Sequence, residues 1–264
     1  MYGKGLRALS LATFAALTAT FALVFFYAPL DADQGFIQKI FYVHVPVSIV
    51  TLCAYVVGAA FAALHLKTRD RKWDLRSYVV IHIALIFNIV GLLTGSIWAK
   101  ASWGHWWVWD EPTLVSFLIV FLLFATYQPL RFSIEDPERQ SRYASVFAIM
   151  AGAFVPLNFA AVRAASPFVH PRVFATSEGG LPGSMAFVFV CAIVAIGLLF
   201  ALLVAYEIAA KQTRWKLRAL RRRALGGEAV APLGRSAAPS LGAPERPSAG
   251  TPPRAPRNPA EAAS

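Results

Sequence analysis

Long apolar runs, separated by short charged segments, dominate the sequence. A lipid core of about 30 Å needs about 20 apolar residues of helix to cross it, so runs of this length predict membrane-spanning helices. Six runs qualify, at 9–30, 41–66, 78–99, 113–130, 143–162 and 185–210. We therefore predict an all-α, polytopic membrane protein whose six transmembrane helices lie within residues 1–210.

Basic residues fall mainly on one side of these predicted spans. Of the 25 Lys and Arg residues, 17 lie on the side of the N-terminus, 4 in the opposite connections and the other 4 in the C-terminal tail. Because basic loops stay in the cytoplasm, the asymmetry predicts cytoplasmic termini and outward loops at 28–40, 99–112 and 163–184. The first run exceeds the roughly 7–15 apolar residues of a signal peptide, so we expect a retained helix.

The composition agrees with a membrane protein. Hydrophobic residues make up 57% and charged residues 15%, with mean hydropathy +0.55 and net charge +11. Soluble domains average about 45–50% apolar and about 25% charged residues. The topology accounts for the basic charge, so no nucleic-acid partner is expected. The sequence has no phosphate-binding Gly-rich loop, Ser/His/Asp arrangement or Cys/His zinc spacing, and we expect no enzyme.

The C-terminal part changes character twice. Residues 211–223 form a basic juxtamembrane segment, which is either a topology signal or a contact with anionic lipid of the inner leaflet. Residues 224–264 hold eight of the 17 prolines, together with many Ala, Gly and Ser residues. Such a segment buries too little apolar area to offset its ordering entropy, which predicts a disordered cytoplasmic tail.

Five of the seven tryptophans lie in the outward segment 98–112. Tryptophans often anchor helices at the lipid headgroups, and an aromatic belt is one interpretation. The density on one side of the membrane exceeds that of an ordinary belt. A shelf of aromatic rings suits a large planar apolar ligand, which is the interpretation we favour.

Two histidines are predicted at the same membrane face. His44 stands where the second span leaves the outer interface, and His170 lies in the third outward loop. Neutral imidazole binds iron well, and aromatic side chains can cover the faces of a macrocycle. The two histidines beside a tryptophan-rich loop therefore indicate a haem held by two imidazoles. His82 and Asn88, inside the third span, are expected to form hydrogen bonds between helices.

The motif Trp-Gly-His-Trp-Trp-Val-Trp-Asp at 103–110 closely resembles the WGxxWxWD signature of the tryptophan-rich (WWD) haem-handling membrane proteins of cytochrome c biogenesis. The six spans, the Tyr-Val-His-Val-Pro element at 42–46 and the segment 94–100 look like the CcmC branch, the haem exporter protein C family. The resemblance covers residues from about 20 to 210.

This resemblance implies a protein of the bacterial inner membrane that holds haem b, non-covalently and in transit, at the periplasmic face. It implies delivery to a haem chaperone of the CcmE type, together with a CcmAB-like transporter and a small CcmD-like subunit. His44 and His170 match the axial ligands. The matching platform residues are Trp103, Gly104, Trp106, Trp107, Trp109 and Asp110.

Other residues near the motif have more than one interpretation. His105 offers a competing ligand, and Glu111 adds negative charge where haem propionates would approach. Arg163 and Arg172 are candidate propionate contacts, or else ordinary loop charges paired with an acidic residue or lipid phosphate. Asp110 is expected to cap the fourth helix, with Pro112 in its first turn.

Two other functions fit a six-span protein. A membrane b-type cytochrome for electron transfer would place histidine pairs within the bilayer, where only His82 clearly lies. A small-molecule transporter would use the tryptophans only as anchors and would show paired, interrupted helices near the midplane.

Overall fold

The computed structural model describes residues 3–165, 169–170 and 181–224. These residues form no strand, and their long helices are α1 (Lys4–Ala22), α2 (Phe41–Thr68), α3 (Arg71–Trp103), α4 (Pro112–Phe132), α5 (Pro137–Ala164) and α6 (Gly183–Ala224). A π-helical turn, Leu23–Tyr27, extends α1, and a 3-10 helix, Phe36–Ile40, leads into α2. With these extensions, six helical segments are long and apolar enough to cross a membrane, which confirms the all-α, six-span prediction.

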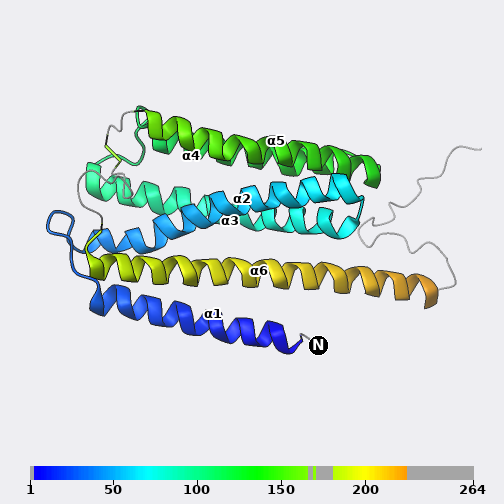
Figure 1. Ribbon diagram of the computed structural model, residues 1–264, viewed down its shortest axis with the longest axis horizontal. Helices are drawn as coiled ribbons and strands as arrows, with labels where there is room; N and C mark the ends of the chain where they lie inside the picture. Colours follow the sequence, from blue (N-terminus) through cyan, green and yellow to red (C-terminus); the bar gives the residue numbers. More distant parts are fainter. Residues whose placement is uncertain (1–2, 166–168, 171–180, 225–264) are drawn as a thin grey trace, which may run out of the picture. The chain divides into compact units, whose positions relative to one another are not determined.

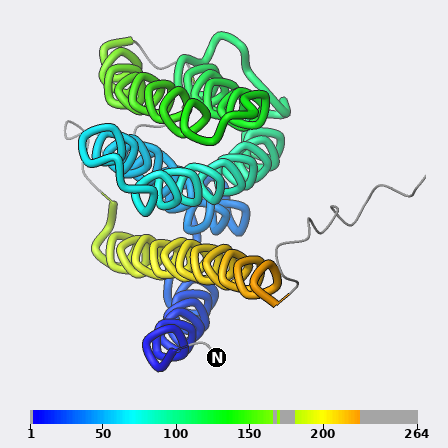
Figure 2. The backbone as a smooth tube through the Cα atoms, turned by 90° about the vertical axis from the view of Figure 1, so that its right-hand side faces the viewer, coloured from blue at the N-terminus to red at the C-terminus, as the bar shows by residue number. Residues whose placement is uncertain are grey.

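Residues 1–217 form one compact unit, and the helices within it run alternately up and down. Helices α4 and α5 make one layer, α2 and α3 the next, then α6 and finally α1 (Figures 1 and 2). The ends of α1, α3 and α5 lie beside the starts of α2, α4 and α6, at one end of the unit (Figure 1). The three loops predicted to face outward therefore leave from the same end.

Helices α3 and α5 begin six or seven residues before the apolar runs that predict them, at Arg71 and Pro137. Helix α3 begins at Arg71 because the Asp70 carboxylate accepts a hydrogen bond from the Lys72 amide at 2.9 Å. In the same way Asp136 caps α5, accepting from the Arg139 amide at 2.7 Å. The basic segment 211–223 continues α6 as helix, and of the predicted tail 224–264 only the first residue lies within the described part.

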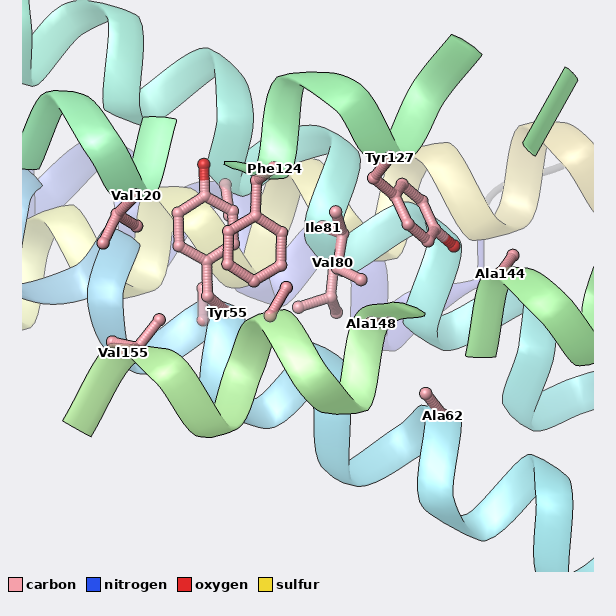
Figure 3. Close-up of a cluster of buried hydrophobic side chains, with 13 residues drawn as sticks. Tyr55, Ala62, Val80, Ile81, Val120, Phe124, Tyr127, Ala144, Ala148 and Val155 are labelled. Atoms are coloured by element: carbon pink, nitrogen blue, oxygen red, sulfur yellow. The ribbon is translucent and has the colours of Figure 1, made fainter. Parts of the chain in front are cut away.

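Small residues bring α2 close to its neighbours. A Cβ atom added to Gly152 of α5 would collide with the Ala59 side chain of α2, and one added to Gly58 would lie 2.7 Å from Ile81 of α3. One turn earlier on α2, the ring of Tyr55 stacks on Phe124 with centroids 3.7 Å apart (Figure 3). Close backbone approach through small residues is the usual way for membrane helices to associate, since lipid offers no hydrophobic driving force between them.

Polar side chains also join the helices. Asn88 donates to the Tyr55 hydroxyl at 3.2 Å, and the Gln128 amide lies 3.4 Å from Nδ1 of His82. The predicted helix-to-helix hydrogen bonds of His82 and Asn88 are thus confirmed. Between α1 and α6, the hydroxyls of Ser10 and Tyr206 lie 3.0 Å apart.

Near the opposite end of the unit, Arg131 of α4 forms two hydrogen bonds with Asp74 of α3, at 2.8 and 2.7 Å. Arg131 belongs to the basic residues that predict topology, yet it is buried. A buried charge is costly unless it is paired and hydrogen-bonded, and this pair meets both conditions.

The tight contact at Gly152 predicts a stability effect. Gly152→Ala forces its new methyl group against Ala59 and should cost about 1–3 kcal/mol, the usual penalty of overpacking. Thermal unfolding of the detergent-solubilised protein measures this. Gly197→Ala in α6 is the matched control, because no atom lies within 4 Å of its added Cβ. Equal unfolding temperatures for the two variants would contradict the packing argument.

Candidate functional site

A cavity of about 240 Å³ lies at the end of the unit that carries the predicted outward loops. Helices α2, α3, α4 and α5 line it, together with Gln34, Trp107 and His170 from the loops. Its wall descends along α2 from His44 to Leu52, a rise of roughly 12 Å. The structure thus places both predicted axial ligands at one cavity, although they lie 126 positions apart in the sequence.

His44 lies in the first turn of α2, against a glycine face of α3. A Cβ atom added to Gly95 would lie 2.7 Å from Cε1 of the imidazole, so only glycine leaves room for the ring. Nδ1 of His44 lies 3.1 Å from the Gly91 carbonyl oxygen and 3.2 Å from the Thr94 hydroxyl. A carbonyl oxygen only accepts hydrogen bonds, which favours the proton on Nδ1. Nε2 then keeps its lone pair for a metal.

The first outward loop contributes Gln34 to the cavity. Asp31 turns this loop by accepting hydrogen bonds from the amides of Asp33 and Gln34, at 3.0 and 2.8 Å. The side-chain Oε1 of Gln34 then accepts from Nε1 of Trp98 at 2.7 Å and from the Ser102 hydroxyl at 3.2 Å. These hydrogen bonds hold the loop against α3. They do so close to His44, because the Trp98 ring packs edge-on against that imidazole.

Lys39 is not a free outward charge. It is 7% exposed, and its ammonium donates to the carbonyl oxygens of Val24 and Ala28, at 2.8 and 2.5 Å. These carbonyls end the helical segment of α1, where the helix dipole favours a cation. Lys39 therefore fixes the base of the first loop.

The predicted tryptophan platform divides into two sets. Trp103 and Trp107 line the cavity, as does Trp98. Trp106 and Trp109 instead are 60% and 71% exposed and do not line it. Nε1 of Trp107 is buried and has no hydrogen-bond partner among the described residues, which leaves a donor for a bound ligand.

The carboxylate that caps α4 is that of Glu111, so the prediction that Asp110 caps this helix is wrong. Glu111 accepts from the Thr113 amide at 3.3 Å, while Pro112 occupies the first turn as predicted. Asp110 is exposed. Glu111 is fully buried, and its second oxygen accepts from the amides of Val169 and His170, at 2.8 and 3.0 Å.

His170 packs edge-on against Trp103, with ring centroids 6.1 Å apart. Arg163 also lines the cavity, with its guanidinium 6.0 Å from the Phe159 ring. His105 is exposed and does not line the cavity. Arg172, the other candidate propionate contact, lies outside the described residues.

Gly104 has a backbone reason to be glycine. It ends α3 in the left-handed conformation, with φ of 78°, and its amide donates to the Lys100 carbonyl at 3.1 Å. Glycine adopts this conformation without steric cost. Trp103 is the last residue of α3, and the turn at Gly104 separates it from the tryptophans that follow.

The sequence analysis gave no role in the site to Gln34, Gly91 or Gly95, and it did not predict the burial of Glu111. The spacing of Gly91 and Gly95 was the available signal, because small residues four apart mark a close helix contact. Gln34 had no comparable signal. Together, two imidazoles, three tryptophans and an apolar wall suit a planar metal-containing macrocycle, and Trp107 and Arg163 offer donors to its acidic groups.

Comparison with known proteins gives a consistent result. A family model described as heme exporter protein C (CcmC) matches residues 1–223. The heme exporter protein C of Rhodobacter capsulatus is 31% identical over 134 residues, which are 51% of this chain and 55% of that protein. The proteins of that name from Paracoccus denitrificans and Escherichia coli K12 are each 30% identical over 149 residues. Those residues are 56% of this chain and 61% and 60% of the two relatives, so the match spans little more than half of their length.

The glycine face beneath His44 predicts a local effect on ligand binding. Gly95→Ala should push the imidazole out of place and weaken binding of added haem about tenfold, since overpacking costs about 1–3 kcal/mol. Titration of haem into the detergent-solubilised protein, followed by its visible spectrum, measures the affinity. Gly197→Ala again serves as the control. Wild-type affinity in Gly95→Ala would show that the ring of His44 does not need this position.

Proposed function

The chain belongs to the heme exporter protein C (CcmC) family, and from this premise we propose that it binds haem between His44 and His170 and delivers it for cytochrome c maturation. The haem is haem b, held non-covalently as cargo. The acceptor is a haem chaperone of the CcmE type. Apart from the exchangeable iron–imidazole bonds, no bond of the haem molecule is made or broken by this chain, so its role is delivery and not catalysis.

The observation that carries the proposal is the convergence of two histidines on one aromatic cavity. His44 and His170 come from different elements, and both line the cavity with Trp98, Trp103 and Trp107. Imidazole nitrogens are suitable axial ligands, and aromatic rings cover a macrocycle by stacking and burial. The hydrogen bond of His44 Nδ1 to the Gly91 carbonyl leaves Nε2 for iron.

The polar rim of the cavity supports one orientation of the cargo. Arg163 carries a positive charge for a propionate, and the buried Nε1 of Trp107 is a second donor. The deeper wall, at Leu52, Val120 and Val155, is apolar and suits the hydrocarbon edge of the ring. The propionates would then lie toward the outward loops. Arg172 is a further candidate for a propionate contact.

The size of the cavity supports delivery. Pockets that enclose drug-sized ligands usually measure about 300–1,000 Å³. At about 240 Å³, this cavity would leave part of a haem outside the protein. Partial enclosure suits a cargo that has to be handed on, because an acceptor can reach the exposed edge.

The distribution of basic residues supports a periplasmic site in a bacterial inner membrane, with cytoplasmic termini. Partners of the CcmAB and CcmD types would act with the chain in the same membrane. Electron transfer by a b-type cytochrome is less well supported. His82, within α3, lies against Gln128 and does not line the cavity.

The proposal predicts a visible spectrum. The purified protein should carry haem with the spectrum of two histidine ligands, and His44→Ala and His170→Ala should each abolish that spectrum. His82→Ala is the control and should keep it, because His82 does not line the cavity. Absence of haem from the wild type, or a spectrum lost only in His82→Ala, would refute the proposed site.

The proposal also predicts a phenotype in the organism. Deletion of the gene should remove covalent c-type cytochromes while b-type cytochromes remain, which stained gels and membrane spectra measure. Complementation by the wild type should restore them, and complementation by His44→Ala should not. Normal c-type cytochromes in the deletion strain would contradict a role in their maturation.

A further inference from the structure

A single buried carboxylate joins three parts of the site. Glu111 follows the tryptophan loop directly and is 0% exposed. One of its oxygens accepts from the Thr113 amide, at the start of α4. The other accepts from the amides of Val169 and His170, two consecutive residues of the segment that carries the second histidine.

The distances show that the strongest of these contacts are to the histidine segment. The bonds from Val169 and His170 measure 2.8 and 3.0 Å, whereas the bond from Thr113 measures 3.3 Å. Hydrogen bonds to an ionised acceptor are stronger than neutral ones, and burial strengthens them further. A capping carboxylate at the surface would take its other hydrogen bonds from water. Glu111 is buried, so it takes them from the backbone amides of Val169 and His170, and it therefore does more than cap α4.

We propose that Glu111 is the positioning residue for His170. Its carboxylate holds the backbone amide of His170 in place. The imidazole of His170 then packs beside Trp103 and lines the cavity. The expected effect of Glu111 on haem binding rests on the proposed function. The hydrogen-bonded connection itself can be tested without haem.

The neighbouring acid does not share this role. Asp110 is exposed, whereas Glu111 is fully buried. Glutamine in place of Glu111 has nearly the same shape but only one acceptor oxygen and no charge. Its single oxygen can accept either from Thr113 or from the amides of Val169 and His170, and in both cases the charge is lost, so Glu111→Gln weakens the connection with little change in volume. Glu111→Asp keeps the charge but withdraws the carboxylate by one methylene group.

The first experiment uses haem-free protein in detergent and hydrogen exchange read by mass spectrometry. Glu111→Gln should speed exchange in the peptide that contains Val169 and His170 by about tenfold or more, because a charge-assisted bond is lost. The peptide around His44 should exchange as in the wild type. Glu207→Gln is the matched control, since Glu207 pairs with Lys211 far along α6. Unchanged exchange at residues 169 and 170 would overturn the proposal.

The second experiment uses haem and a double-mutant cycle. Glu111→Gln should lower the fraction of haem with two histidine ligands and lower haem affinity about tenfold. Added to His170→Ala, it should lower the affinity no further, because both changes act on the same ligand. Added to His44→Ala, it should still lower it. An equal further loss in both backgrounds would show that Glu111 acts on the fold in general and not through His170.

The outcomes separate the two proposals. If the wild type binds no haem, the proposed function fails and the exchange experiment still decides the role of Glu111. If the wild type shows two histidine ligands and Glu111→Gln matches it in both experiments, the role of Glu111 fails and the function stands. Should Glu111→Gln not fold, Glu111→Asp answers the same questions, with smaller changes of the same sign expected.

Discussion

The close approach of α2 to α3 at Gly91 and Gly95 is the constraint on which the outer cavity depends. The His44 ring occupies the space that a side chain at Gly95 would fill. The same approach puts the Gly91 carbonyl within hydrogen-bond distance of Nδ1 and so favours one tautomer. It also brings Trp98 against the imidazole, and Trp98 in turn holds the first loop through Gln34. A wider helix separation would therefore remove the ligand, its orientation and part of the cavity rim together.

Hydropathy and charge predicted the architecture well because a lipid bilayer restricts the spanning segments to long apolar helices. The first residues of α3 and α5, Arg71 and Pro137, lie outside the apolar runs. Hydropathy could not predict them, because Asp70 and Asp136 set these helix starts by capping. The charge count predicts the orientation of the spans but says nothing of burial. Lys39 and Arg131 were both counted as loop charges, and both are buried among hydrogen-bond acceptors.

The site was predictable in its residue types and less so in its geometry. The motif drew attention to the tryptophans, yet a motif cannot tell which rings face inward. The structure shows that Trp103 and Trp107 line the cavity, whereas Trp109 is exposed. Asp110 and Glu111 could not be distinguished as caps from sequence, because both are acidic and both precede Pro112 closely. Burial distinguishes them, because Glu111 is 0% exposed and accepts from the amides of Val169 and His170, which are distant in the sequence.

The two candidate ligands are held by different kinds of interaction, and the difference bears on release. His44 belongs to the long helix α2, and its ring is packed against Gly95 of α3. Moving the ring therefore requires α2 and α3 to separate. The backbone of His170 is held to Glu111 by two hydrogen bonds, from the amides of Val169 and His170. Breaking two hydrogen bonds costs less free energy than separating two packed helices. Under the proposed function, exchange of haem to an acceptor would therefore begin with loss of the His170 bond, while His44 keeps the iron in place.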